Sequence, residues 1–179
     1  MRTVLSALAL LAIASLAHAE VIYVDIDATG ANDGTSWADA FTDLQAALRA
    51  TTSGEIWVAA GTYYPGVAGD QLATFRLRSG VALYGGFEGH ETALGERSSD
   101  PGLTVLSGDI GTPGDDTDNS YHVVTGSGTD STAVINGFTV TGGYADGSGS
   151  EEFGGGMYIA AGSPTVANVT FSSNFASVI

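Results

Sequence analysis

The sequence predicts an all-β fold in which short strands wind into stacked coils, a β-solenoid, with one α-helix near the N-terminus. Three observations predict it. Apolar and polar residues alternate in many short segments, a Gly, Asp, Asn or Ser closes each segment, and two segments near the C-terminus repeat each other. No helical periodicity of useful length follows residue 50, so the helical crossovers of a doubly wound sheet are excluded.

Residues 1–19 are expected to be a cleaved signal peptide. Arg2 gives a positive start, residues 4–16 form an apolar run, and residues 17–19 (AHA) offer the small residues that signal peptidase accepts. A retained membrane anchor is the alternative, but it needs roughly 20 apolar residues and this run is shorter. We therefore expect a secreted chain that begins at Glu20, with no membrane-spanning segment in the mature protein.

Residues 20–54 are expected to form an N-terminal cap. Residues 21–25 (VIYVD) alternate as a strand does, and a turn-rich segment follows. A helix is predicted over residues 36–50, with Ser36 as its N-cap and Asp39 three residues later. Its apolar stripe consists of Trp37, Phe41, Leu44 and Leu48.

Residues 55–179 are expected to form the coils. Predicted strands with a period of two cover residues 55–59, 62–64, 74–77, 81–84, 103–106, 121–124, 133–135 and 138–140. Residues 135–143 (INGFTVTGG) and 166–174 (VANVTFSSN) align at an offset of 31 and place apolar residues at matching positions. A repeat of this length is typical of a β-solenoid, although an antiparallel β-sandwich has the same composition and stays open as an alternative.

The composition excludes two classes of binding partner and one source of stability. The formal net charge is −15, so the chain is not expected to bind nucleic acid or an anionic lipid surface. Because the sequence contains no Cys, disulfide bonds cannot stabilise the exported protein. Burial and backbone pairing must supply its stability instead.

Several segments resemble bacterial secreted right-handed parallel β-helix proteins, which have the fold of pectate lyases. The segments are residues 23–25 (YVD), 30–37 (GANDGTSW), 56–63 (IWVAAGTY), 81–87 (VALYGGF), 106–110 (LSGDI) and 119–124 (NSYHVV). Residues 154–157 (GGGM) and 171–174 (FSSN) are similar to the repeats of polymorphic outer membrane proteins, with Gly156 and Met157 where that pattern has Ala and Ile.

The resemblance implies how the parts are used. The helix would cover the open end of the first coil, and the protein would lie outside the cell or on the outer-membrane surface of a bacterium. Residues 153–179 carry no charged side chain and do not resemble a C-terminal cap. We therefore expect either that a longer solenoid continues beyond residue 179 or that the last coil docks end to end on another chain.

A calcium site is predicted where carboxylates gather in a Gly-rich turn. Its candidate ligands are Asp109, Asp115, Asp116, Asp118 and Asn119. A second cluster contains Asp25, Asp27, Asn32 and Asp33, but Thr29 and Ser36 occupy ligand positions of an EF-hand loop, so that motif is rejected. The alternative for both clusters is that Asp, Asn and Gly simply form good turns.

Catalytic residues are harder to find in the sequence. A polysaccharide lyase of this fold requires a base and cations. Arg76 and Arg78 are the candidate cationic pair, and His122, beside Asp109, is a candidate general base. Arginines on a solvated strand and an outward-facing histidine are the alternative interpretation. No catalytic residue is therefore assigned.

Tyrosines beside glycines could stack on sugar rings, although ordinary strand packing is the simpler explanation. They are Tyr63, Tyr64, Tyr84 and Tyr144. We expect a secreted or cell-surface module with a binding, adhesive or structural role, whose partner is an extracellular glycan or a surface protein. A carbohydrate-active enzyme, either a polysaccharide lyase or a glycoside hydrolase, is the alternative.

Overall fold

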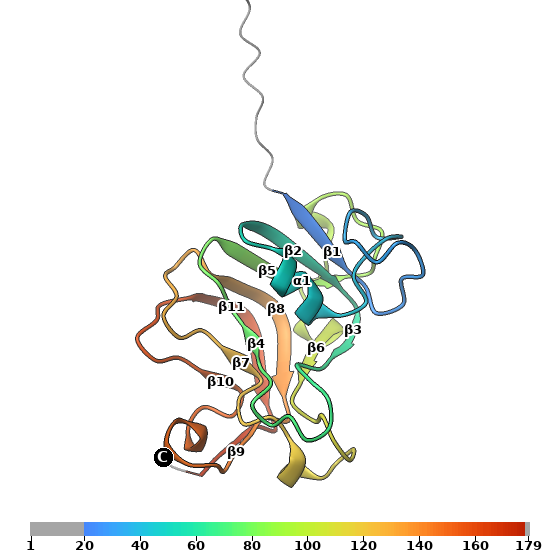
Figure 1. Ribbon diagram of the computed structural model, residues 1–179. Coiled ribbons are helices and arrows are strands. Elements are labelled where there is room, and N and C mark those ends of the chain that lie inside the picture. The colour runs from blue at the N-terminus through green and yellow to red at the C-terminus, as the bar shows by residue number, and fades with distance from the viewer. Residues whose placement is uncertain (1–19, 178–179) are drawn as a thin grey trace, which may run out of the picture.

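The computed structural model describes residues 20–177 and contains mostly β-strands with one α-helix (Figure 1). The expectation of an all-β chain with one short helix is confirmed. The predicted signal peptide, residues 1–19, lies outside the described residues. Within the described part, no helix is long and apolar enough to cross a membrane.

The strands form three groups that are all internally parallel. The largest sheet has the order β1 (Val21–Val24), β2 (Gly54–Ala59), β5 (Val81–Phe87), β8 (Val134–Thr141), β6 (Thr104–Ser107) and β3 (Gly61–Tyr63), and β11 (Thr165–Ser172) also pairs with β8. The second has the order β10 (Met157–Tyr158), β7 (Val124–Thr125) and β4 (Phe75–Arg76), and the third joins β12 (Phe175–Ala176) to β9 (Tyr144–Ala145).

Parallel pairing excludes one of the two folds that the sequence left open. Every strand pair within residues 20–177 is parallel, so the antiparallel sandwich is wrong. Val134 pairs with Thr165 and Tyr144 with Phe175, at the same offset of 31 that relates the two similar segments in the sequence. The large sheet curls, and the β4–β7–β10 group lies across from it (Figure 1).

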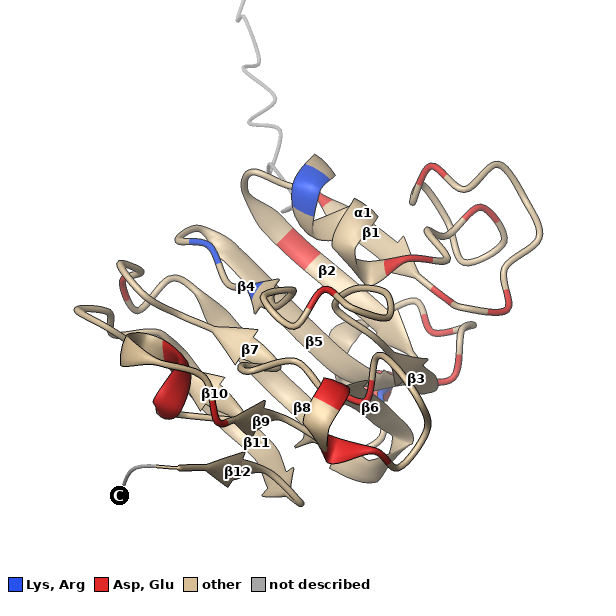
Figure 2. Cartoon of the chain, turned by 60° about the horizontal axis from the view of Figure 1, so that its bottom comes forward, with Lys and Arg blue, Asp and Glu red and all other residues tan. Residues whose placement is uncertain are grey.

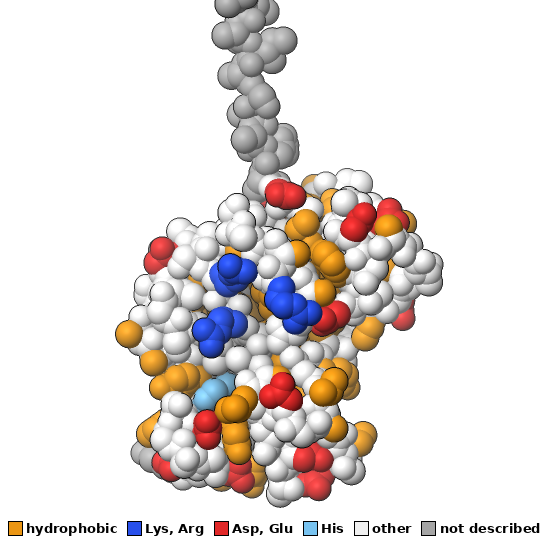
Figure 3. Space-filling model, viewed as in Figure 1, with side chains coloured by type: hydrophobic (Ala, Val, Ile, Leu, Met, Phe, Trp, Pro, Cys, Tyr) orange, Lys and Arg blue, Asp and Glu red, His pale blue; other side chains and the backbone are white. Residues whose placement is uncertain are grey.

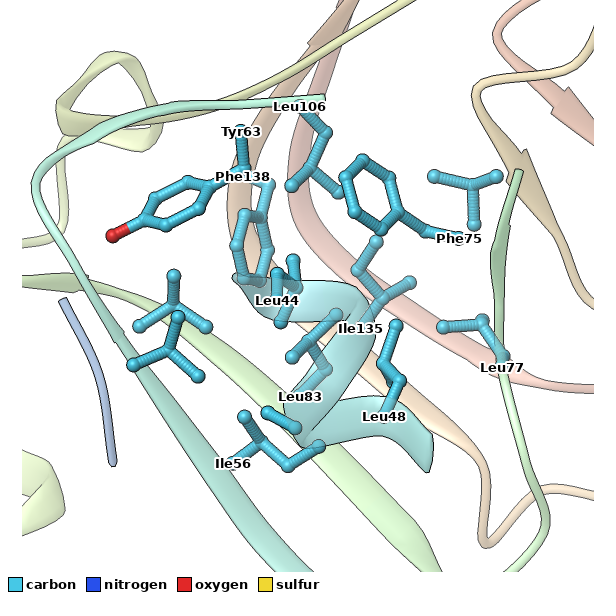
Figure 4. Close-up of a cluster of buried hydrophobic side chains, with 14 of the residues drawn as sticks. Leu44, Leu48, Ile56, Tyr63, Phe75, Leu77, Leu83, Leu106, Ile135 and Phe138 are labelled. Carbon is cyan, nitrogen blue, oxygen red and sulfur yellow. The ribbon is translucent and has the colours of Figure 1, made fainter. Parts of the chain in front are cut away.

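The core fills the space enclosed by these strands (Figure 4). Alternation puts Leu83 and Ile135, which pair between β5 and β8, into this core at 1% and 0% exposure. Leu106 on β6 of the same sheet and Phe75 on β4 of the second sheet also fill it, and both are completely buried. Each such side chain contributes about 1.5–3 kcal/mol by leaving water, which replaces the disulfides that the chain cannot form.

The helix α1 (Leu44–Ala50) is shorter than the sequence predicted. Its N-cap is Asp43, whose carboxylate accepts hydrogen bonds from the backbone N–H groups of Gln45 and Ala46. The predicted start at Ser36 is wrong, because Phe41 is extended and forms a parallel bridge with Val24 of β1. Ser36 and Asp39 do bond to each other, but within a turn.

The buried face of α1 covers the N-terminal end of the core. Leu44, Ala47 and Leu48 are 1%, 0% and 4% exposed, and they pack in the same cluster as Ile56 of β2. Figure 4 shows Leu44 and Leu48 pointing from the helix toward these strands. The helix therefore covers apolar side chains of the core that would otherwise be exposed near β1 and β2.

Candidate functional site

The β4–β7–β10 group carries a groove on its outer side. Along β4 and its continuation, Phe75 and Leu77 are buried while Arg76 and Arg78 are exposed, because successive side chains of a strand point to opposite faces. A pocket of about 210 Å³ opens beside Arg76. Its lining is Leu72, Thr74, Arg76, Tyr121, His122, Thr125, Ser127, Ser150, Glu151 and Tyr158.

His122 forms one wall of this pocket. Its ring stacks on that of Tyr158 with centroids 4.8 Å apart and planes 15° apart, and its Nδ1 lies 3.3 Å from the Gly154 carbonyl oxygen. Burial lowers the pKa of the imidazole below its ordinary value, although the Gly154 carbonyl and the Glu151 carboxylate act in the opposite direction. His122 is therefore neutral at pH 7 and able to accept a proton.

The arginines extend the pocket into a longer basic groove. A second hollow of about 300 Å³ is lined by Gln45, Leu48, Arg49, Arg76 and Arg78. Arg76 lines both hollows, so they adjoin. We call the combined surface the basic groove; Figure 3 shows basic side chains gathered on this face with a histidine beside them.

Few protein groups neutralise these guanidinium groups. Arg78 donates a hydrogen bond to the Leu48 carbonyl at 3.2 Å. Arg49 forms the single ion pair found within residues 20–177, at 3.3 Å from Asp43, and both side chains are largely exposed. Arg76 has neither an ion pair nor a hydrogen bond to another described residue, which leaves its five N–H donors for a ligand.

The predicted calcium ligands divide into two groups. Most acidic residues lie in loops outside the sheets (Figure 2). Asp116 begins the 3₁₀ turn η3 (Asp116–Asp118), Asp115 precedes it as the N-cap, and both side chains are exposed. The carboxylate of Asp115 accepts hydrogen bonds from the backbone N–H and hydroxyl of Thr117. These bonds lower the pKa of Asp115.

Asp109, Asp118 and Asn119 lie in the same closed loop but are less exposed. The loop closes through a 2.9 Å hydrogen bond from the Ser120 N–H to the Gly108 carbonyl, one residue from Asp109 on one side and Asn119 on the other. Within the described chain, no three His, Cys, Asp or Glu side chains lie together as a metal-binding group. Any cation here would therefore need amide or hydroxyl oxygens in addition to carboxylates.

The second acidic cluster makes turn contacts. Asp25 accepts from the Asp27 N–H, Asp33 from the Thr35 N–H and hydroxyl, and Asn32 from the Thr42 N–H. These bonds are what the turn interpretation of the cluster predicts.

The four tyrosines chosen from the sequence lie outside the basic groove. Tyr63 is buried with its hydroxyl donating to the Ala59 carbonyl, Tyr84 lies under Arg97, and Tyr144 stacks on Phe175. Tyr64 is 47% exposed beside α1.

The aromatic residues of the groove, Tyr121 and Tyr158, were missed as binding residues. The signal that could have found Tyr158 is its place directly after residues 154–157 (GGGM), a repeat motif that ends in a strand. His122 also contacts Tyr158 and Gly154, on the groove side, and not Asp109 as the sequence suggested.

Comparison of the chain with family models, curated proteins and solved structures found no match. The function therefore has to be argued from the geometry of the groove itself.

Proposed function

We propose that the chain is a secreted, cell-surface module of the right-handed parallel β-helix type, and that it binds an anionic extracellular glycan in the basic groove. The β-helix is supported by parallel pairing in all three sheets and by an offset of 31 residues between β8 and β11 and between β9 and β12. Apart from α1 between β1 and β2, loops and short 3₁₀ turns join these strands, as coils stacked along one axis require.

One observation carries the binding function: three of the four arginines in residues 20–177 line a single groove that also contains stacked aromatic rings. Guanidinium groups bind carboxylates and sulfates in bidentate fashion, and aromatic faces pack against the apolar faces of sugar rings. A linear acidic glycan presents both features at a regular spacing, and a groove along stacked strands offers it several residues at once.

The acidity of the whole protein is compatible with an anionic ligand. Exposed charges farther away than about 8 Å are largely screened at physiological ionic strength, so the arginines in contact with the ligand dominate. The groove should therefore bind its glycan less tightly as salt rises, in contrast to a site that works by stacking alone.

The test is a titration of the protein with an oligogalacturonate, with an uncharged glucan oligomer as the comparison ligand. Arg76→Gln removes one charge-assisted contact, worth about 1.5–3 kcal/mol, and should weaken oligogalacturonate binding by roughly 10- to 100-fold. Arg97→Gln changes the net charge equally but lies in a separate pocket with Leu94 and Asn168, so it should preserve the affinity. Equal losses in both variants, or equal affinity for both glycans, would contradict an anion-binding groove.

A second function, cleavage of the same glycan, is favoured by the neutral His122 beside Arg76 and Glu151 in one pocket. In a β-elimination, a base removes the proton next to the uronate carboxylate, a carbon–carbon double bond forms, and the glycosidic C–O bond breaks with protonation of the leaving oxygen. Arg76 would stabilise the charge that develops on the carboxylate. Ultraviolet absorbance from an unsaturated product, lost in His122→Ala, would replace binding by cleavage as the function.

A further inference from the structure

The loop between β6 and β7 contains an unusual group of buried oxygens. Four buried side-chain polar atoms in residues 20–177 have no hydrogen-bond partner, and all four belong to this one loop. They are Asp109 Oδ1, Asp118 Oδ1, Asn119 Oδ1 and Ser120 Oγ. Asn119 and Ser120 are 2% and 0% exposed, so water outside the protein cannot satisfy them.

The backbone of the loop is already organised around these atoms. Asp109 Oδ2 accepts from the Gly114 N–H at 3.1 Å, and Asp118 Oδ2 accepts from the Thr112 N–H at 2.8 Å. Each carboxylate thus uses one oxygen to hold the loop and leaves the other buried and unused. The Ser120 to Gly108 hydrogen bond closes the loop behind them.

No basic side chain within residues 20–177 forms an ion pair with either carboxylate. Arg97 is the last Lys or Arg in the sequence, and it bonds to Gly85 and Asn136 on another part of the molecule. His122, the nearest histidine in the sequence, faces the basic groove. Two carboxylates that each keep one buried oxygen without a donor are costly, and a neutral water molecule would leave both charges uncompensated.

We propose that this loop binds Ca²⁺ through Asp109, Asp118, Asn119 and Ser120. Ca²⁺ takes six to eight oxygens in irregular geometry and accepts carboxylates, amide carbonyls and water, whereas Mg²⁺ demands a near-ideal octahedron. Two carboxylates with an amide and a hydroxyl oxygen suit Ca²⁺. Asp115 and Asp116, two ligands that the sequence predicted, are not part of the site: they are exposed, and Asp115 is occupied by Thr117.

The site would also hold one wall of the basic groove. Gln71 donates from its side-chain amide to the backbone carbonyls of Thr117 and Asn119. The backbone carbonyl of Gln71 accepts a hydrogen bond from the Tyr121 N–H. Tyr121 follows Ser120 directly and lines the groove. A cation in the loop therefore fixes the backbone from which Tyr121 projects, whatever ligand the groove takes.

The experiment is a calcium titration by calorimetry, together with melting curves in EDTA and in Ca²⁺. Wild-type protein should bind one Ca²⁺ with a Kd of roughly 0.1–1 mM, as extracellular modules do. At about 10 mM Ca²⁺ its Tm should rise by about 3–10 °C relative to EDTA. Mg²⁺ at the same concentration should raise it much less.

Two variants separate a site from general attraction to an acidic loop. Asp118→Asn should abolish the heat of binding and the rise in Tm, whereas Asp116→Asn removes the same charge from an exposed neighbour and should retain both. In EDTA, Asp118→Asn should melt at or above the wild-type temperature, because one of the two uncompensated carboxylate charges is gone; in Ca²⁺ the order should reverse. This crossing also shows that the variant folds, and a purely structural role for Asp118 would not produce it.

Absence of heat and equal melting temperatures in EDTA and Ca²⁺ for the wild type would overturn the site, as would equal loss of binding in Asp116→Asn and Asp118→Asn. These measurements use the metal alone, so they remain valid if the basic groove fails to bind any glycan.

Discussion

Alternating apolar residues are buried at the N-terminal end of the large sheet, near β1, but exposed at its C-terminal end, at β11. At the N-terminal end, β1 and β2 lie beneath α1, and Val24, Ile56 and Val58 are completely buried. At the other end, β11 pairs only with β8 among the described strands, and most of its residues are exposed. One end of the core is covered and the other is open.

Paired residues make the contrast quantitative. Ile135 on β8 is 0% exposed, while its partner Val166 on β11 is 40% exposed; Val140 is 0% exposed, while its partner Phe171 is 46% exposed. Within each pair the sequence pattern is similar and the side chains occupy equivalent positions along the stack. Burial therefore depends on whether another layer lies above the strand, and alternation in the sequence alone does not reveal it.

The largest effect is expected from a charge placed at the covered end. Leu44→Asp puts a carboxylate among Leu48, Ile56 and the rest of the core without a partner, which should cost more than about 4 kcal/mol and prevent folding. Val166→Asp introduces the same group at the open end and should change stability by less than about 1 kcal/mol. Circular dichroism melting and size-exclusion chromatography of both variants measure this difference.

If Leu44→Asp remained monomeric with a wild-type Tm, the helix would not be covering a core. Severe unfolding of Val166→Asp would mean instead that β11 is covered in solution, either by another chain or by further coils.

A smaller effect is expected from removing one aromatic ring from each strand of the β8–β11 pair. Phe138 is completely buried and should lose about 3–5 kcal/mol on replacement by Ala. Phe171→Ala should lose roughly 1 kcal/mol, because the ring is already half in water. Urea denaturation midpoints with unchanged m values measure both. Losses of similar size would remove the distinction between a covered and an open end.

The sequence predicts most of β2 and residues 81–84 of β5, but it divides β8 into two strands, 133–135 and 138–140, because Asn136 and Gly137 are typical of a turn. It places the start of the helix wrongly because Phe41 pairs with Val24, a contact between distant residues that local helical spacing does not reveal. The short strand β10 was not predicted at all, since two residues show no periodicity.

The candidate sites follow the same rule. The outward direction of Arg76 and Arg78 is a local consequence of alternation and could be predicted. That Arg76 lines one pocket with Tyr158 depends on the pairing of β4 with β7 and of β7 with β10, which a single sequence does not reveal. The acidic loop was found by composition, but only the structure separates the buried oxygens of Asp109, Asp118 and Asn119 from the exposed Asp115 and Asp116.

The smallest expected effect is a loss of stability at low pH, and it should differ between the N-terminal and C-terminal ends of the large sheet. Glu91 is 7% exposed, and its carboxylate accepts three hydrogen bonds from the backbone N–H groups of Glu88, Gly89 and His90. Its backbone carbonyl accepts from the indole of Trp37, which ties it to the turn that precedes α1. Burial opposes ionisation of Glu91, but the three N–H donors outweigh it and lower the pKa of the carboxyl.

A pKa that is lower in the folded than in the unfolded protein stabilises the fold at neutral pH, and this stabilisation disappears as the pH falls through the lowered value. Glu91→Gln should therefore cost about 1–2 kcal/mol at pH 7 and progressively less as the pH falls from about 5 to about 3. Residues 153–177 contain no charged side chain, so acid should weaken the N-terminal end first. Hydrogen exchange measured at pH 7 and at about pH 3 checks this order, because amides of β1 and β2 should lose protection before those of β8. Loss of protection in the reverse order would contradict the role of Glu91. A cost of Glu91→Gln that does not change with pH would contradict it as well.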